Sequence, residues 1–166
     1  MIAVLLAALA LQSPVPATGP SAPSDGVAVA EAASQAAATL DRMHQAAAHG
    51  DGAAYFAQFA PDARFIGTDA SERWSLDQFH AYADPVFARG RGWTYHPRER
   101  ALTTAGDLAW FDEILDHDAY GVLRGSGVLR RRDGVWKIEQ YVLSFAVPND
   151  RAEAVVDVIR EAGEAP

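Results

Sequence analysis

Charged side chains interrupt two neighbouring apolar segments in the last third of the chain. Residues 108–115 carry Asp112 and Glu113, and residues 122–130 carry Arg124. Both segments alternate as β-strands do, so one of the two carboxylates must point inward. A buried arginine needs a carboxylate or an anionic ligand as its partner. The pattern therefore predicts that Arg124 pairs with Asp112 or Glu113, and parity alone leaves both carboxylates open.

This predicted ion pair has two interpretations. In the structural interpretation it only ties two strands together. In the functional interpretation Asp112 or Glu113 is a catalytic group that accepts a proton, while Arg124 holds an anionic or carbonyl oxygen of a ligand. Ser126 shares the face of Arg124, so it is expected to bind the same ligand.

The last apolar segment adds an amide to the predicted site. Trp136 and Ile138 alternate with Lys137 and Glu139, which places the tryptophan and the isoleucine on the inner face of a strand. The same alternation carries Gln140 inward. Glutamine is no general acid or base, but it can donate and accept hydrogen bonds to a ligand.

Two further residues complete the predicted ligand-binding set. Trp110 shares a strand face with Asp112, and Asp69 follows a short predicted strand over residues 63–68. The alternative for Asp69 is a turn aspartate that caps local backbone groups. The five histidines lie in different predicted elements, so no metal site is expected, and no cofactor is implied.

The elements that would position these residues are helices followed by strands. Residues 106–148 contain three apolar runs separated by turn signals at 118–121 and 132–134, which predicts a three-stranded antiparallel meander. Helices are predicted over 27–49, 52–59 and 76–89, and a last one over 151–162. This order predicts an α+β domain with helices packed on one curved sheet.

Composition excludes several classes of function. The net charge is −8, which disfavours nucleic acid and anionic membranes as partners. The chain has no cysteine, so disulfides, thiolate metal sites and a cysteine nucleophile are excluded.

The N-terminus has the pattern of a secretory signal. Residues 2–11 are an unbroken apolar run, and Val15-Pro16-Ala17 offers small residues at a cleavage site. We therefore expect a signal peptide over 1–17, a flexible linker over 18–26, a folded domain over 27–150 and a C-terminal helix or tail over 151–166. We expect the protein to be exported to the periplasm or the exterior, and the mature chain to have no membrane segment once the signal peptide has been cleaved.

The segments themselves resemble a known family. PDARFIGTDASERWS, GDLAWFDE and RGSGVLRRRDGVWKIEQYVLSF, together with the terminal VPN, are similar to the SnoaL-like branch of the nuclear transport factor 2-like superfamily. The resemblance covers residues 40–149. It implies a cone-shaped α+β barrel, in which a curved antiparallel sheet wraps around a long helix, with a pocket at the open end and Asp69 near its rim.

The resemblance leaves the activity open because this fold hosts isomerases, dehydratases, binding proteins and assembly domains. Ketosteroid isomerases of the superfamily place their catalytic groups where this chain has Met43, Gly67 and Ser126, so that chemistry is not expected. The leading hypothesis is a barrel that binds a small, partly apolar molecule and acts, if it is an enzyme, as a cofactor-free lyase, isomerase or hydrolase. The alternative is a non-catalytic assembly module. A homodimer through the outer sheet face is expected in either case.

Overall fold

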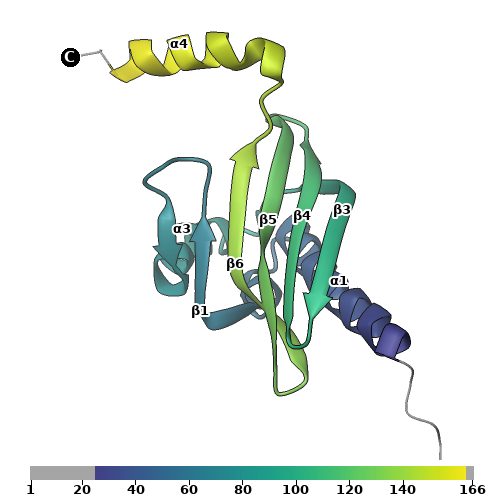
Figure 1. Ribbon diagram of the computed structural model, residues 1–166. Helices are drawn as coiled ribbons and strands as arrows, with labels where there is room; N and C mark the ends of the chain where they lie inside the picture. The colour runs from purple at the N-terminus through teal and green to yellow at the C-terminus, as the bar shows by residue number, and fades with distance from the viewer. Residues whose placement is uncertain (1–24, 164–166) are drawn as a thin grey trace, which may run out of the picture.

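The computed structural model describes residues 25–163, so the predicted signal peptide and nearly all of the predicted linker lie outside the described residues. The described elements, in chain order, are α1 (Asp25–Ala48), α2 (Gly52–Phe56), β1 (Phe59–Ile66), β2 (Arg73–Ser75), α3 (Leu76–Phe87), β3 (His96–Ala105), β4 (Leu108–His117), β5 (Gly121–Arg132), β6 (Val135–Phe145), a 3-10 turn η1 (Asn149–Arg151) and α4 (Ala152–Gly163). The predicted α+β class is confirmed (Figure 1).

One six-stranded sheet contains all the strands, in the order β2-β1-β6-β5-β4-β3. Strands β3 to β6 pair antiparallel with their neighbours, which confirms the predicted meander. Strand β1, however, runs parallel to β6, so the sheet is mixed and has two free edges instead of being an antiparallel closed barrel. The long connection through α3 and β3–β5 lets β1 and β6 run in the same direction.

A glycine turn and two side-chain caps mark the ends of the helices near the sheet. Gly50 has a φ of 68°, a conformation that favours glycine, and it follows the end of α1. The Asp51 side chain accepts a hydrogen bond from the Ala54 amide at 2.9 Å at the start of α2. Ser75 and Gln78 form the reciprocal capping box that the sequence predicts for α3.

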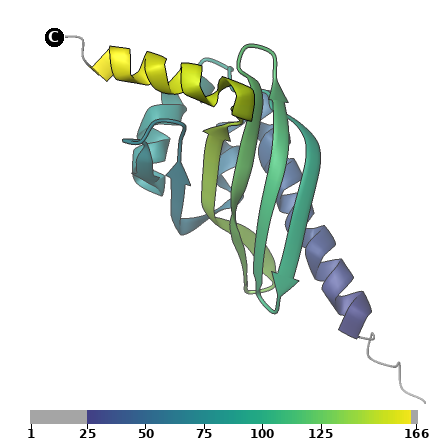
Figure 2. The same cartoon turned by 45° about the horizontal axis from the view of Figure 1, so that its top comes forward.

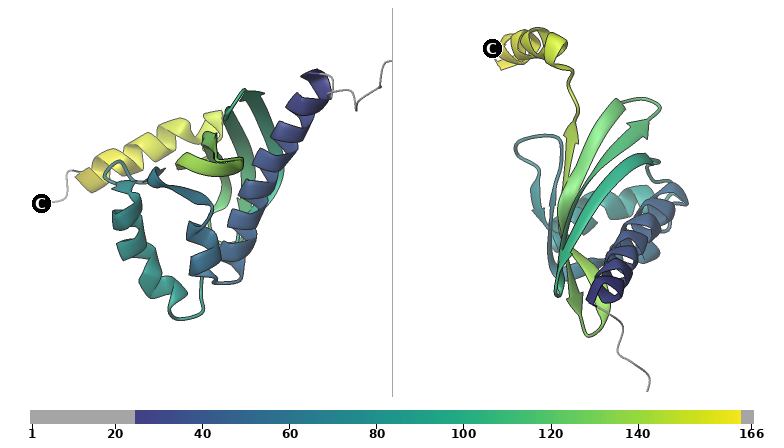
Figure 3. Two further views of the ribbon diagram at one scale, coloured as in Figure 1. Left: turned by 90° about the horizontal axis from the view of Figure 1, so that it is seen from below. Right: turned by 45° about the vertical axis from the view of Figure 1, so that its right-hand side comes forward.

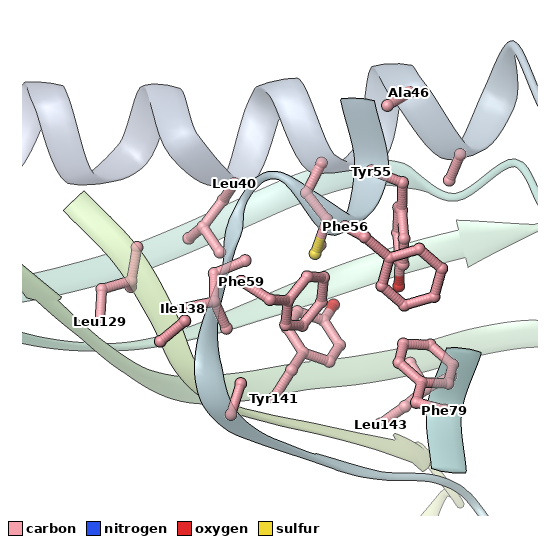
Figure 4. Packing of buried hydrophobic residues seen from close by; sticks show 14 of the residues in the cluster. Leu40, Ala46, Tyr55, Phe56, Phe59, Phe79, Leu129, Ile138, Tyr141 and Leu143 are labelled. Atoms are coloured by element: carbon pink, nitrogen blue, oxygen red, sulfur yellow. The ribbon is translucent and has the colours of Figure 1, made fainter. Parts of the chain in front are cut away.

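Helix α1 lies across one face of the curved sheet (Figure 3). Its buried residues recur at helical spacing and face the strands: Ala36, Thr39, Leu40, Met43, His44, Ala46 and Ala47. Figure 4 shows Leu40 of this helix close to Ile138 and Leu129 of the sheet, with Tyr55 and Phe56 farther along. The inner face of the sheet and α1 therefore enclose the core.

A β-bulge changes the face that β6 turns to the core. Trp136 and Ile138 are buried, as predicted, but the next buried residues are Tyr141 and Leu143. The pairing with β5 shifts between Leu129 and Val128, and the extra residue reverses the alternation. The side chains that follow the bulge thus have the opposite orientation from the one that strict alternation predicts.

Helix α4 extends away from the sheet beyond the end of β6 (Figure 2). It forms where the sequence predicts the last helix, and its Val155, Val158 and Ile159 side chains are exposed. Within residues 25–163, no helix combines the length and apolar character needed to span a membrane.

Candidate functional site

A cavity of about 390 Å³ opens between the helices and the inner face of the sheet. Aromatic rings form most of its wall, and all five tyrosines of the chain take part. The lining includes Met43, His44, Tyr55, Trp93, Tyr95 and Tyr141. The volume lies in the range of small-molecule sites, and the apolar wall excludes water from a bound ligand.

His44 is the imidazole in the cavity wall, and Glu113 lies directly behind it. Nε2 of His44 is 2.8 Å from Oε1 of Glu113, and the two side chains are 7% and 0% exposed. The hydroxyl of Tyr141 donates to the same Oε1 at 2.8 Å. A buried carboxylate from β4 is therefore joined to two cavity-lining residues, one on α1 and one on β6.

The second oxygen of Glu113 is paired with Arg100 of β3. Nε of Arg100 donates to Oε2 at 2.8 Å. Nη2 also lies 2.8 Å from Oε2, but only Nε has the angle of a hydrogen bond. Nη1 donates to Asp41 of α1 at 2.7 Å and to the carbonyl of Ala37 at 3.3 Å. Arg100 therefore connects the buried carboxylate with α1.

These contacts keep Glu113 ionised. Burial by itself would raise the pKa of the Glu113 carboxyl, but the hydrogen bond from His44, the charge of Arg100 and the hydrogen bond from Tyr141 together hold it below its usual range. Burial and the neighbouring Glu113 raise the pKa of the Tyr141 hydroxyl, so Tyr141 stays protonated and donates.

The ionised carboxylate determines the tautomer of His44. A carboxylate only accepts hydrogen bonds, so Nε2 of His44 must carry the proton that it donates to Glu113. In the neutral ring the lone pair then lies on Nδ1, which has no hydrogen-bond partner among residues 25–163. An imidazole held in this way, in the wall of an apolar cavity, is suited to accept a proton from a bound molecule.

Gly125 makes room for this network on β5. It is the register partner of Glu113. A Cβ atom at Gly125 would collide with the hydroxyl of Tyr141 and would lie 2.9 Å from Cγ of Glu113. The glycine is therefore needed for space, and its φ is not in the left-handed region.

The structure decides between the two predicted carboxylates of β4. Alternation along β4 requires that one of the two carboxylates points inward, and it is Glu113, on the same face as Phe111. Asp112 and Trp110 point outward. Trp110 is 51% exposed. Neither Asp112 nor Trp110 lines the cavity, so the structure does not bring these predicted catalytic and ligand-binding residues to it.

The observed ion-pair partner of Glu113 differs from the predicted one. Arg124 and Ser126 share a face, as predicted, but it is the outer one, because Gly125 and Leu129 fill the inner face. Arg124 is exposed and takes part in no ion pair within the described chain, where the arginine next to Glu113 is Arg100.

Gln140 and Asp69 also lie outside the cavity lining. Gln140 follows the bulge of β6, so its side chain is not on the face of Trp136 and Ile138. Asp69 accepts hydrogen bonds from the backbone amide and the hydroxyl of Ser71, at 2.8 and 2.5 Å. The turn interpretation therefore describes its contacts.

The residues that sequence reasoning missed left recognisable signals. His44 lies on the buried stripe of the first helix, next to Met43 and four residues after Leu40. The hairpin between β3 and β4 pairs Ala105 with Leu108, and Arg100 precedes the first by as many residues as Glu113 follows the second. Their pairing could therefore be read from the turn, once the turn position was known.

Comparison with known proteins identifies the domain and the fold. Residues 36–148 match the model of the SnoaL-like domain. No curated protein matches the sequence significantly.

Three solved structures illustrate the structural similarity. An NTF2-like protein of unknown function from Pseudomonas putida KT2440 has a TM-score of 0.62 and 18% identity, covering 73% of this chain and 91% of its own. A candidate dehydratase of the NTF2-like family from Streptomyces avermitilis has a TM-score of 0.63 and 12% identity, and the match covers 72% of this chain and 99% of the dehydratase. A candidate ketosteroid isomerase from Shewanella frigidimarina NCIMB 400 has a TM-score of 0.56 and 22% identity, and the match covers 68% of this chain and 97% of the isomerase. At these identities the similarity concerns the fold alone.

Proposed function

The chain belongs to the SnoaL-like domain family, and we propose that its cavity binds an uncharged, largely apolar small molecule from which His44 removes a proton. The observation that carries this proposal is the contact between Glu113 and His44 at the wall of the cavity. The resulting activity is that of a cofactor-free lyase or isomerase.

The network supports proton transfer in three ways. Glu113 holds the His44 ring in one orientation and stabilises the imidazolium that forms when Nδ1 takes a proton. Arg100 and Tyr141 keep Glu113 ionised, so it acts as a positioning residue and not as the base itself. The aromatic wall lowers the local dielectric constant, so the few polar groups of the cavity interact more strongly with a charged intermediate than they would in water.

Proton abstraction in this cavity can be tested with 5-nitrobenzisoxazole, an uncharged aromatic carbon acid. A base removes the hydrogen on its C3 carbon, the N–O bond breaks, and a nitrile and a coloured phenolate form, so no oxidant or cofactor is needed. The wild-type protein should accelerate this elimination, and His44→Gln should lose about 100-fold or more of the rate.

The matched control is His49→Gln, because His49 is exposed in the turn directly after the same helix and lies outside the cavity lining. It should retain the wild-type rate. Equal rates for wild-type protein and His44→Gln, with both proteins folded by circular dichroism, would rule out His44 as the base.

The non-catalytic assembly module is the second candidate, and cavity volume separates the two. A module whose core is filled by its own side chains needs no cavity, whereas a ligand site needs about 300 Å³ or more. The volume of about 390 Å³ therefore favours ligand binding.

We also propose that the protein is a homodimer through the outer face of the sheet. Trp110 is half-exposed there, and Ile114, Val128 and Val142 are only partly buried on the same face. An isologous contact would cover them. Light scattering should give twice the mass of one chain for the wild-type protein, and Trp110→Asp should shift it toward the monomer. A wild-type monomer at micromolar concentration would refute the dimer.

Export is proposed from the sequence pattern of residues 1–17 alone. The mature chain should begin at Thr18, which N-terminal sequencing of protein from the cell envelope would detect. A chain with intact Met1 recovered from the cytosol would contradict export.

A further inference from the structure

Helix α4 leaves one apolar side exposed. It has 12 residues, and Val155, Val158 and Ile159 recur at helical spacing on the same side. Val158 and Ile159 are 65% and 64% exposed. A helix of about 12 residues is marginal in water by itself, so α4 needs a surface that covers this side.

The polar side of α4 indicates what kind of surface that is. It carries Glu153, Asp157 and Glu161 against a single arginine, Arg160, which lies 3.6 Å from Asp157. Helices that bind a membrane surface usually have lysine and arginine on their polar side, where these residues meet anionic lipid. The excess of carboxylates on α4 does not suit such a membrane. It suits a protein surface that combines apolar side chains with unpaired cations.

The outer face of the sheet has this combination over β2, β1 and β6. Arg73 is the register partner of Ile66, and Ile66 is the register partner of Val142. Phe65 lines the cavity, so its neighbours Arg64 and Ile66 point outward. Arg64 and Arg73 are exposed and take part in no ion pair within residues 25–163. Two free cations therefore border an apolar strip on the outer face.

Helix α4 of the same chain leaves this surface uncovered. Figure 1 and Figure 2 show α4 reaching past the end of β6 on the side of β1, so that it lies on neither face of its own sheet. The apolar side of the helix and the arginines of the sheet are thus both exposed in the described chain. In an isologous pair each copy gives its helix and receives the other, which covers both surfaces at once.

We propose that α4 of one copy lies across β1 and β6 on the outer sheet face of a second copy. The apolar side of the helix covers Ile66 and Val142, and its acidic flanks meet Arg64 and Arg73. Arginine side chains are long enough to lie beside a packed helix instead of beneath it. This contact extends the dimer proposed around Trp110 toward β1, and it rests on that dimer only in requiring that two copies meet.

The absence of cysteine from the chain allows a test with single thiols. Ile159→Cys protein is mixed with ¹⁵N-labelled Val142→Cys protein and treated with bismaleimidoethane, which joins two nearby thiols. Intact-mass spectrometry separates mixed pairs from like pairs by the ¹⁵N mass. Docking raises the local thiol concentration, so mixed pairs should form about 100-fold faster than pairs between Ile159→Cys and the control Asp107→Cys. Asp107 is exposed in the turn between β3 and β4.

Charge reversal tests the predicted ion pairs. Arg64→Glu together with Arg73→Glu, in the Val142→Cys protein, should slow mixed cross-linking by about 10-fold. Glu153→Arg together with Glu161→Arg, in the Ile159→Cys partner, should restore the rate. Restoration is a result that a general loss of structure would not give. Reversal that leaves the rate unchanged would refute the role of the arginines.

The remaining outcomes separate this inference from the proposed dimer and from docking within one chain. Mixed pairs that form no faster than the control overturn the proposal, and light scattering that still gives a dimer then leaves the contact around Trp110 standing. A chain with both thiols that cross-links within itself, while the mixture does not react, overturns it in favour of α4 folding onto its own sheet. Val158→Cys and Ile66→Cys place thiols on the same two surfaces and repeat the test if either first variant does not fold.

Discussion

The two faces of β4 and β5 have similar side chains but different physical roles. On the inner face, Glu113 is fully buried and makes hydrogen bonds to three residues from three other elements. On the outer face, Asp112 and Arg124 are exposed and pair with nothing in the described chain. The two adjacent carboxylates thus differ in their surroundings, because Glu113 is buried among hydrogen-bond donors whereas Asp112 is exposed to solvent. Chemical capacity at this site depends on burial and partners more than on residue type.

The strongest test of this contrast is to remove each carboxylate in turn. Glu113→Ala leaves His44, Arg100 and Tyr141 without their shared acceptor, so the free energy of unfolding should fall by about 3–5 kcal/mol. Asp112→Ala should change it by no more than about 0.5 kcal/mol. Urea unfolding of the two variants measures the difference, and similar midpoints would contradict it.

The next test enlarges one side-chain position on each face of β5. Gly125→Ala puts Cβ against the Tyr141 hydroxyl and the Glu113 side chain, so we expect a loss of about 1–3 kcal/mol in unfolding free energy. Its control is Ser126→Val, the adjacent outward position, which should be nearly neutral. Thermal unfolding of the two variants and of the wild type measures the difference in stability. A Gly125→Ala protein as stable as wild type would show that the network tolerates the added atom.

A third test uses pH. The pKa of Glu113 is lowered in the fold from an ordinary value of 4.5, so the unfolded chain binds the proton more readily. Its contribution to stability is therefore complete above that value and is lost as pH falls through the folded pKa. As the pH falls below 4.5, wild-type stability should therefore fall more steeply than that of Glu113→Gln. Parallel curves would mean that Glu113 does not titrate differently on folding.

The smallest effect is expected at Arg124. Because its side chain is exposed and has no carboxylate partner in the described chain, Arg124→Met should change the unfolding free energy by no more than about 0.5 kcal/mol. Arg100→Met, which leaves the buried Glu113 without its cation, is the contrasting variant. Calorimetry that finds a larger loss for Arg124→Met than for Arg100→Met would reverse the assignment of the two faces.

Local patterns in the sequence predicted much of the fold. The capping box at Ser75, the meander and the burial of Trp136 and Ile138 follow from short-range chemistry and alternation. Alternation also required one inward carboxylate on β4, and Glu113 is that residue. These features depend on residues close together in the chain.

The candidate site was harder to predict because it depends on contacts between distant segments. Gln140 was placed inward by strict alternation, and one extra residue at the bulge of β6 reverses that orientation. The sequence pattern points to Arg124 on the strand after β4, whereas the partner of Glu113 is Arg100 on the strand before it. The role of His44 depends on α1 packing over the sheet, which no local pattern of its own helix specifies.

The most direct test of the central claim is the tautomer of His44. In protein labelled with ¹⁵N-histidine, a long-range ¹H–¹⁵N spectrum at about pH 8 distinguishes protonated from bare ring nitrogens, and His44→Gln identifies the His44 signals. If Glu113 holds the ring as described, Nε2 is protonated and Nδ1 carries the lone pair that serves as the base. A protonated Nδ1 with a bare Nε2 would contradict the claim, because Glu113 would then have no proton to accept from His44.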